Sequence, residues 1–255
     1  MVPAWLETFS LLFVWLSILC AVWIAIDLLR RPQKMWIMDL VWPLTAFYTG
    51  PLGLAAYHAI GVRSARASAG GRKAPAGRHH GSAPAFAGGK PGRDGAAEAD
   101  GGRSERARKP FWAAVLTGSM HCGAGCAVGD FVGEWLVFAT GATILGSKLG
   151  ANYAVAFVLA YMVGIFFQYF SIAPMRGLGL RDGLWAAMKA DTLSLAAYEI
   201  GMFAWMAVTQ KVLFPGLEPT SWTFWFMMQI AMVAGFFPSY PVNWWLVEIG
   251  VKERM

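Results

Sequence analysis

The chain has 255 residues, of which 57% are hydrophobic and only 14% carry a charge. Soluble globular domains use about 25% charged residues, so this composition excludes an ordinary soluble protein and indicates one embedded in a membrane. The 13 Trp residues agree with this, because Trp favours the membrane interface. Three Cys residues are too few for a disulfide framework.

Residues 1–62 are predicted to form an amino-terminal helical hairpin of two hydrophobic segments. Leu6–Ile26 is long enough for a retained membrane span. Prolines and a glycine interrupt Leu40–Val62, which is therefore either a kinked span or a re-entrant hairpin. A span gives six crossings with both termini inside, whereas a re-entrant hairpin gives five crossings and termini on opposite sides. The positive-inside rule leaves both topologies open.

Residues 63–109 carry the basic charge of the protein. They hold eleven Lys and Arg against four Asp and Glu, so the net charge of +6 comes from this segment and the remainder sums to −1. Gly, Ala, Ser and Pro dominate it, which predicts a disordered basic linker that buries too little surface to fold. Basic charge confined to such a linker does not indicate nucleic-acid binding.

Residues 110–255 are predicted to form a four-helix membrane domain. The whole chain is therefore expected to be an all-α polytopic membrane bundle of about six hydrophobic helices, with the linker after the second. The four later segments are Pro110–Leu145, Leu149–Met175, Leu184–Phe214 and Pro219–Val247.

The third hydrophobic segment carries a polar stripe. Cys122, Cys126, Asp130 and Glu134 follow one another at intervals of four residues, which places them on one side of a helix. Acidic residues inside a membrane are costly and are candidates for function. The stripe is therefore the primary candidate site.

An adjoining stripe of glycines has the same spacing. Gly125, Gly129 and Gly133 are predicted to let the backbone of another helix approach closely. This packing would turn the thiols and carboxyls toward the interior of the bundle.

The two thiols suggest a soft metal ion, copper or zinc, because thiolate and thioether ligands select such ions. Cys122 and Cys126 would be the main ligands, with Met120 or His121 as auxiliary ligands. His121 points about 100° away from Cys122 around a helix, so both meet one metal only where the helix is broken.

Two other interpretations stay open. The first is an accessory membrane protein whose Gly and Cys residues form only a packing seam, since Cys also packs as a small hydrophobe. The second is a proton- or ion-coupled transporter that uses intramembrane carboxyls. Its candidate groups, which also serve as outer partners of a metal site, are Asp130, Glu134, Asp191, Tyr198 and Glu199.

Four motifs stand out in the sequence. They are His121–Cys126 with Gly129–Asp130 and Glu134–Trp135, Pro238–Leu246, Met35–Met38, and Trp42–Thr45. Together they resemble a prokaryotic membrane family catalogued as domain of unknown function 4396. The resemblance covers most of the chain outside the linker and implies a helical fold in the plasma membrane. Members of that family are often labelled as copper oxidases or joined to copper-binding modules, which favours copper.

Nothing in the sequence indicates a soluble enzyme, since phosphate-binding loops, nucleophile elbows and zinc-protease motifs are absent. The leading hypothesis is a multi-pass membrane protein that binds or handles a soft metal ion, copper, and whether it is also an enzyme stays open, with the sequence favouring a role other than catalysis. Its expected partners are the lipid bilayer, a second copy of the chain or a copper protein.

Overall fold

The computed structural model describes residues 2–33, 35–62 and 110–252, apart from the side chains of 173–176. The described chain is all-α, as predicted. The predicted linker 63–109 lies outside the described residues. The elements are α1 (Ala4–Arg30), α2 (Trp36–Thr49), α3 (Pro51–Ala56), the π-helix η1 (Tyr57–Gly61), α6 (Phe111–Thr140), α7 (Lys148–Arg176), α8 (Leu180–Val208), the π-helix η2 (Thr209–Leu213) and α9 (Trp222–Glu248).

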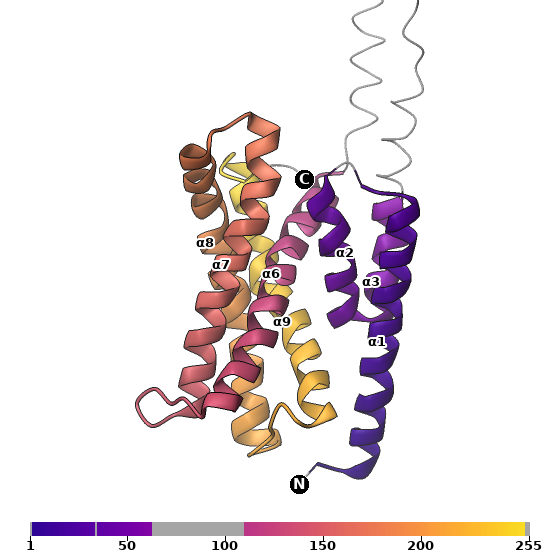
Figure 1. Cartoon of the computed structure of the whole chain (residues 1–255), viewed down its shortest axis with the longest axis vertical. Coiled ribbons are helices and arrows are strands. Elements are labelled where there is room, and N and C mark those ends of the chain that lie inside the picture. The colour runs from indigo at the N-terminus through magenta and orange to yellow at the C-terminus, as the bar shows by residue number, and fades with distance from the viewer. Residues whose placement is uncertain (1, 34, 63–109, 253–255) are drawn as a thin grey trace, which may run out of the picture.

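The five long helices form an antiparallel bundle with α6 near its centre (Figure 1). Helix α6 packs mainly on α7 and also contacts α8 and α9, while α1 lies against α2 and α9. We call the end of the bundle where α9 finishes the carboxyl end, and the opposite end, where α1 begins, the amino end (Figure 1).

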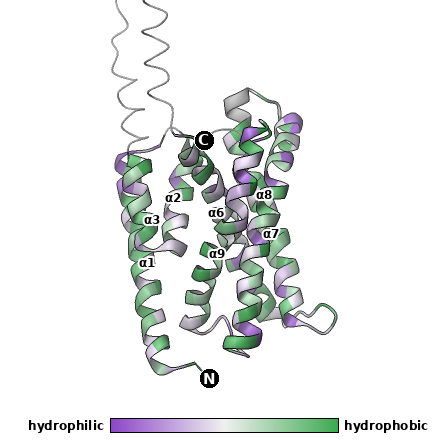
Figure 2. Ribbon diagram, turned by 180° about the vertical axis from the view of Figure 1, so that it is seen from behind, coloured by the Kyte–Doolittle hydropathy of each residue, from purple (hydrophilic) through white to green (hydrophobic). Residues whose placement is uncertain are grey.

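Four segments are long and apolar enough to cross a membrane, namely Ala4–Arg30, Phe111–Thr140, Lys148–Ile172 and Leu180–Leu213. Figure 2 shows that α1 is hydrophobic along most of its length. Large apolar side chains on its outer face, including Trp5, Trp15 and Trp23, are exposed. An apolar face of this size suits lipid rather than water.

The interrupted segment Leu40–Val62 folds as a helical hairpin. Helix α2 has 14 residues, which at about 1.5 Å per residue is shorter than the roughly 30 Å hydrocarbon core of a bilayer. The chain then reverses at Gly50 and returns through α3 and η1. The Gln33 side-chain Nε2 donates a hydrogen bond to the Gly61 carbonyl at 3.2 Å, so both ends of the hairpin lie together. Of the two topologies left open, this geometry matches five long helices plus a re-entrant hairpin.

The reversal at Gly50 requires glycine, because its φ of 59° is rarely adopted by residues with a side chain. A Cβ atom at this position would also lie 2.9 Å from Ser17 Oγ of α1. We expect Gly50→Ala to destabilise the protein by about 1–3 kcal/mol, measured as a lower thermal midpoint in detergent. Gly150→Ala is the control, since a Cβ there makes only ordinary contacts at 3.5 Å. Equal midpoints for the two variants would contradict the role given to Gly50.

Three of the glycines of α6, those of the predicted glycine stripe, lie against α7. A Cβ on Gly125 would lie 3.1 Å from Gly164 Cα, and one on Gly133 would lie 3.1 Å from Ala156 Cα. A Cβ on Gly129 would overlap the backbone of Ala160. The two helix backbones are therefore closest at Gly129, and the polar stripe of α6 faces away from lipid.

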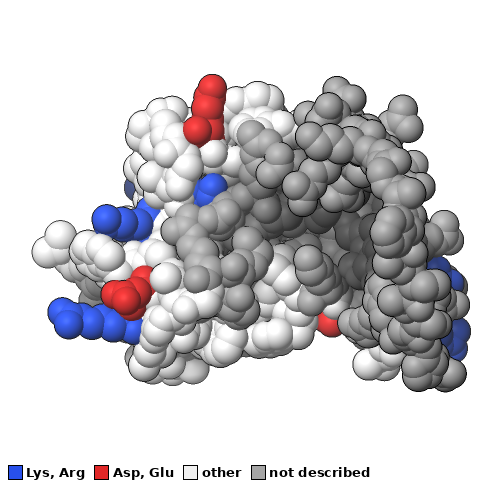
Figure 3. All heavy atoms as spheres, turned by 90° about the horizontal axis from the view of Figure 1, so that it is seen from above, with Lys and Arg blue, Asp and Glu red and all other residues white. Residues whose placement is uncertain are grey.

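The carboxyl end carries exposed basic residues on the loops and helix ends. Figure 3, which views the bundle from this end, shows Lys and Arg side chains around the edge of the face together with a few acidic ones. Exposed members include Arg30, Arg31 and Arg181. Lys252, although it follows the end of α9 at the same end of the bundle, is only 2% exposed.

Candidate functional site

The Lys252 side chain enters the bundle and ends among polar side chains from three helices. Its ammonium group donates hydrogen bonds to Asn243 Oδ1 at 2.7 Å, Ser194 Oγ at 3.1 Å and Cys122 Sγ at 3.3 Å. Asp191 Oδ1 lies 4.0 Å from the same nitrogen. These five buried residues are called the lysine cluster below.

A tight turn after α9 directs Lys252 inward. Gly250 has a φ of 74°, and the backbone N–H groups of Val251 and Lys252 both bond to the Leu246 carbonyl at 3.0 Å. The stem of the lysine then passes Gly118 of α6, where a Cβ would lie 3.6 Å from Lys252 Cε. The stem therefore lies in the space between α6 and α9 beside Gly118.

Asp191 joins the lysine cluster to α7. The Cys122 thiol donates a hydrogen bond to its Oδ1 at 3.3 Å and lies 3.1 Å from Ser194 Oγ. The second oxygen, Oδ2, packs so closely on Gly164 that a Cβ there would collide with it. The carboxylate is thus held between an ammonium, a thiol and a glycine backbone, all shielded from solvent.

Further along α6, two buried acidic side chains interact with no Lys or Arg bonded to them among the described residues. Glu199 of α8 lies beside the Cys126 thiol and interacts electrostatically with Asp130. Both carboxyls are 1% exposed. Among the described residues, no nitrogen or oxygen donor bonds to any of their four oxygens. Asp130 also interacts with Glu134 one turn away. Glu199, Asp130 and Glu134 are called the acid row.

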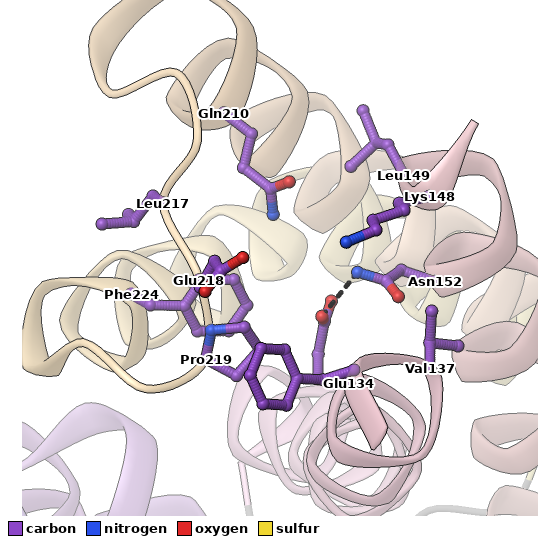
Figure 4. A pocket seen from close by; sticks show the side chains of 11 residues that line it. Glu134, Val137, Lys148, Leu149, Asn152, Gln210, Leu217, Glu218, Pro219 and Phe224 are labelled. Carbon is purple, nitrogen blue, oxygen red and sulfur yellow. Dashed lines mark hydrogen bonds between the residues drawn. The ribbon is translucent and has the colours of Figure 1, made fainter. Parts of the chain in front are cut away.

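The acid row ends at a pocket on the amino end of the bundle. Asn152 of α7 donates a hydrogen bond to Glu134 Oε2 at 2.7 Å, and both residues line the pocket (Figure 4). The Lys148 and Gln210 side chains also point into it (Figure 4). Its volume of about 80 Å³ holds several water molecules. Glu134 is therefore the member of the row that lies next to solvent.

Two tyrosine hydroxyls lie beside the centre of the site. Tyr198 of α8 donates a hydrogen bond to the Met232 carbonyl at 2.5 Å. A Cβ on Gly123 would come 2.5 Å from the Tyr48 hydroxyl and 2.8 Å from the Tyr198 hydroxyl. The α2–α3 hairpin thus brings Tyr48 into the interior next to Cys122 and Cys126. The hairpin therefore contributes a side chain to the site.

The remaining predicted ligands point elsewhere. Helix α6 is continuous from Phe111 to Thr140, so the break that a shared metal would need near His121 is not there. His121 Nε2 lies 3.0 Å from Ser171 Oγ of α7. Met120 packs in the apolar cluster around Trp42, whereas Cys122 and Cys126 belong to another cluster. Among the residues described, no group of three or more His, Cys, Asp and Glu is placed to hold a metal ion. Copper or zinc at Cys122 and Cys126 stays a prediction.

The structure brings together most of the predicted polar residues of α6 and α8 and adds three that sequence reasoning missed. These are Asn152, Asn243 and Lys252. Asn152 and Asn243 lie within helices that are mostly apolar, which is a usable signal because buried polar side chains need partners. Lys252 gave no such signal, because a lysine just after a hydrophobic helix is ordinarily a surface residue.

Comparison with known families gives one match, over residues 111–252, to the family described as a domain of unknown function, DUF4396. The chain belongs to the DUF4396 family. The DUF4396 match begins with α6 and includes the lysine cluster and the acid row. Comparison with curated proteins and with solved structures gave no match.

Proposed function

We propose that this DUF4396 protein is a multi-pass membrane protein that translocates protons along the acid row. The observation that carries the proposal is the burial of two interacting carboxyls, Asp130 and Glu199, whose oxygens have no nitrogen or oxygen donor among the described residues. An ionised carboxylate buried without a partner costs many kcal/mol. Such a pair is stable when a proton or another cation accompanies it.

The excess of buried carboxyls over buried cations also supports proton translocation. Four carboxyls, those of Asp130, Glu134, Asp191 and Glu199, are buried within the described residues, against Lys252 as the only buried Lys or Arg there. Lys252 faces Asp191, so it does not neutralise the acid row. Three acidic groups therefore need protons or mobile cations, which is the usual property of a proton relay inside a membrane.

The order of the groups supports a pathway rather than an isolated pair. Cys122 and Glu134 are twelve residues apart on α6, which corresponds to about 18 Å along the helix axis. Polar groups follow one another over that length, from the lysine cluster past Cys126 to the acid row and the pocket at Glu134. A proton entering from the pocket would meet Glu134 first, then Asp130 and Glu199.

Proton flux into liposomes tests the proposal. Reconstituted protein is given a potassium diffusion potential with valinomycin, and a trapped pH-sensitive dye reports the internal pH. We expect wild-type protein to acidify the lumen, and Asp130→Asn and Glu199→Gln to lower the rate at least about tenfold, because an amide cannot carry the proton. Glu248→Gln, at an exposed site beyond the row, is the control and should retain the wild-type rate.

Wild-type flux no greater than that of protein-free liposomes would overturn the proposal. So would full flux in the Asp130→Asn/Glu199→Gln double variant, provided that each variant elutes as a single folded species before reconstitution.

A further inference from the structure

The lysine cluster has the form of a cation site whose occupant is part of the chain. Its acceptors come from three helices, α6, α8 and α9, and surround one ammonium group. The site is closed, since Lys252 is 2% exposed and Asn243, Ser194 and Cys122 are fully buried. A group that binds here must bring its own hydrogen-bond donors and a positive charge.

The acceptors are oriented to receive donors. Asn243 directs its amide Nδ2 to the Ser239 carbonyl and hydroxyl, each at 2.9 Å, which leaves Oδ1 facing the ammonium. Cys122 donates its own proton to Asp191. Ser194 has the Asp191 carbonyl within 3.2 Å as an acceptor for its own proton. With these protons directed elsewhere, three acceptors match the three N–H bonds of a primary ammonium.

The occupant Lys252 lies on a short segment that follows α9. Beyond α9, the segment that carries Lys252 is held by backbone hydrogen bonds to the last turns of the helix, and Ile249 in that segment is 50% exposed. The acceptors, by contrast, belong to the long helices of the bundle. The acceptors therefore belong to helices, and the lysine to the segment that follows the last of them.

We propose that the acceptors Asn243, Ser194, Cys122 and Asp191 form a binding site for primary ammonium cations, which Lys252 fills as a tethered occupant. A free alkylammonium cation binds there when the Lys252 side chain is absent. Three hydrogen bonds and the Asp191 carboxylate select R–NH₃⁺ over a quaternary cation, which has no N–H group to donate. The proposal concerns binding alone and does not depend on proton translocation.

The test removes the Lys252 side chain and supplies a free ligand of the same shape. Lys252→Ala removes Cγ, Cδ, Cε and Nζ, and n-propylammonium supplies the same four heavy atoms. Thermal midpoints of the detergent-solubilised protein are compared in n-propylammonium chloride and in choline chloride at equal concentration. We expect propylammonium to raise the midpoint of Lys252→Ala by at least about 3 °C relative to choline, since a ligand that binds only the folded state stabilises it.

Three controls separate the site from general salt effects. Wild type should not respond, because Lys252 already fills the site. Lys252→Met should not respond, because the Met side chain occupies the path beside Gly118 without an ammonium. Lys252→Ala/Asp191→Asn should lose most of the shift, because the counter-charge is gone.

Equal midpoints of Lys252→Ala in the two salts would overturn the proposal, and so would an equal rise in wild type. Where Lys252→Ala does not fold in choline, the variant is purified throughout in each salt and its elution is compared. A monodisperse species only in propylammonium supports the site, whereas aggregation in both salts overturns it. Because no flux is measured, this result is independent of the liposome experiment.

Discussion

Gly129→Ala is expected to cause one of the two largest losses of stability in this protein. A Cβ at residue 129 would overlap the backbone of Ala160, and a backbone cannot move aside by changing a rotamer as a flexible side chain can. Overpacking usually costs about 1–3 kcal/mol, and here α6 and α7 must separate along their closest contact. We expect a cost of about 3 kcal/mol or more, seen as a lower thermal midpoint and a larger aggregated fraction in detergent.

Gly133→Ala is the matched control for this prediction. It lies one turn further along the same face, and its Cβ would lie 3.1 Å from Ala156 Cα, so a small shift relieves the contact. Alanine also has a helix propensity about 1 kcal/mol better than that of glycine, which offsets part of the cost. A midpoint for Gly129→Ala equal to that of Gly133→Ala would show that the helices are not in closest contact at Gly129.

Separating Lys252 from Asp191 is expected to be as damaging as that overlap. Lys252→Met leaves the Asp191 carboxylate buried without its cation, and Asp191→Asn leaves the ammonium without its anion. Breaking one side of a buried ion pair costs about 3–5 kcal/mol. The double variant Asp191→Asn/Lys252→Met removes both charges and should recover most of that loss, because a neutral buried pair carries no uncompensated charge.

This double-mutant cycle is measured as the thermal midpoints of the wild type, the two single variants and the double variant. A double variant more stable than either single variant establishes coupling between the two charges. Losses that simply add would mean that Lys252 acts through its contacts with Asn243 and Ser194 rather than through Asp191.

The helices themselves could be predicted from the sequence because each long one is a hydrophobic run of sufficient length. Both the location of α6 and the single side of it that carries Cys122, Cys126, Asp130 and Glu134 follow from spacing. The same regularity argued against a shared metal at His121, since an unbroken helix turns neighbouring side chains apart. Local geometry is thus well determined by periodicity along a single helix.

Contacts between helices could not be predicted, because they join residues far apart in the chain. Asp191 meets a thiol 69 residues before it, and Lys252 meets the same thiol from 130 residues away. Periodicity gives the face of a helix but not the partner that lies against it. For Lys252 even the buried state was unexpected, because the turn at Gly250 that directs it inward is a three-dimensional feature.

The re-entrant hairpin α2–α3 makes the number of crossings odd, and this determines on which sides of the bundle the two termini lie. A segment that enters and returns adds length without adding a crossing, so five long helices alternate in direction between the two termini. In a bilayer, the amino terminus would then face one compartment and the carboxyl terminus the other. The residues that flank the basic segment, Val62 and Pro110, would lie in the same compartment as Lys252. A single glycine-dependent reversal at Gly50 would thereby decide on which side of the bundle Val62 lies relative to the end of α9.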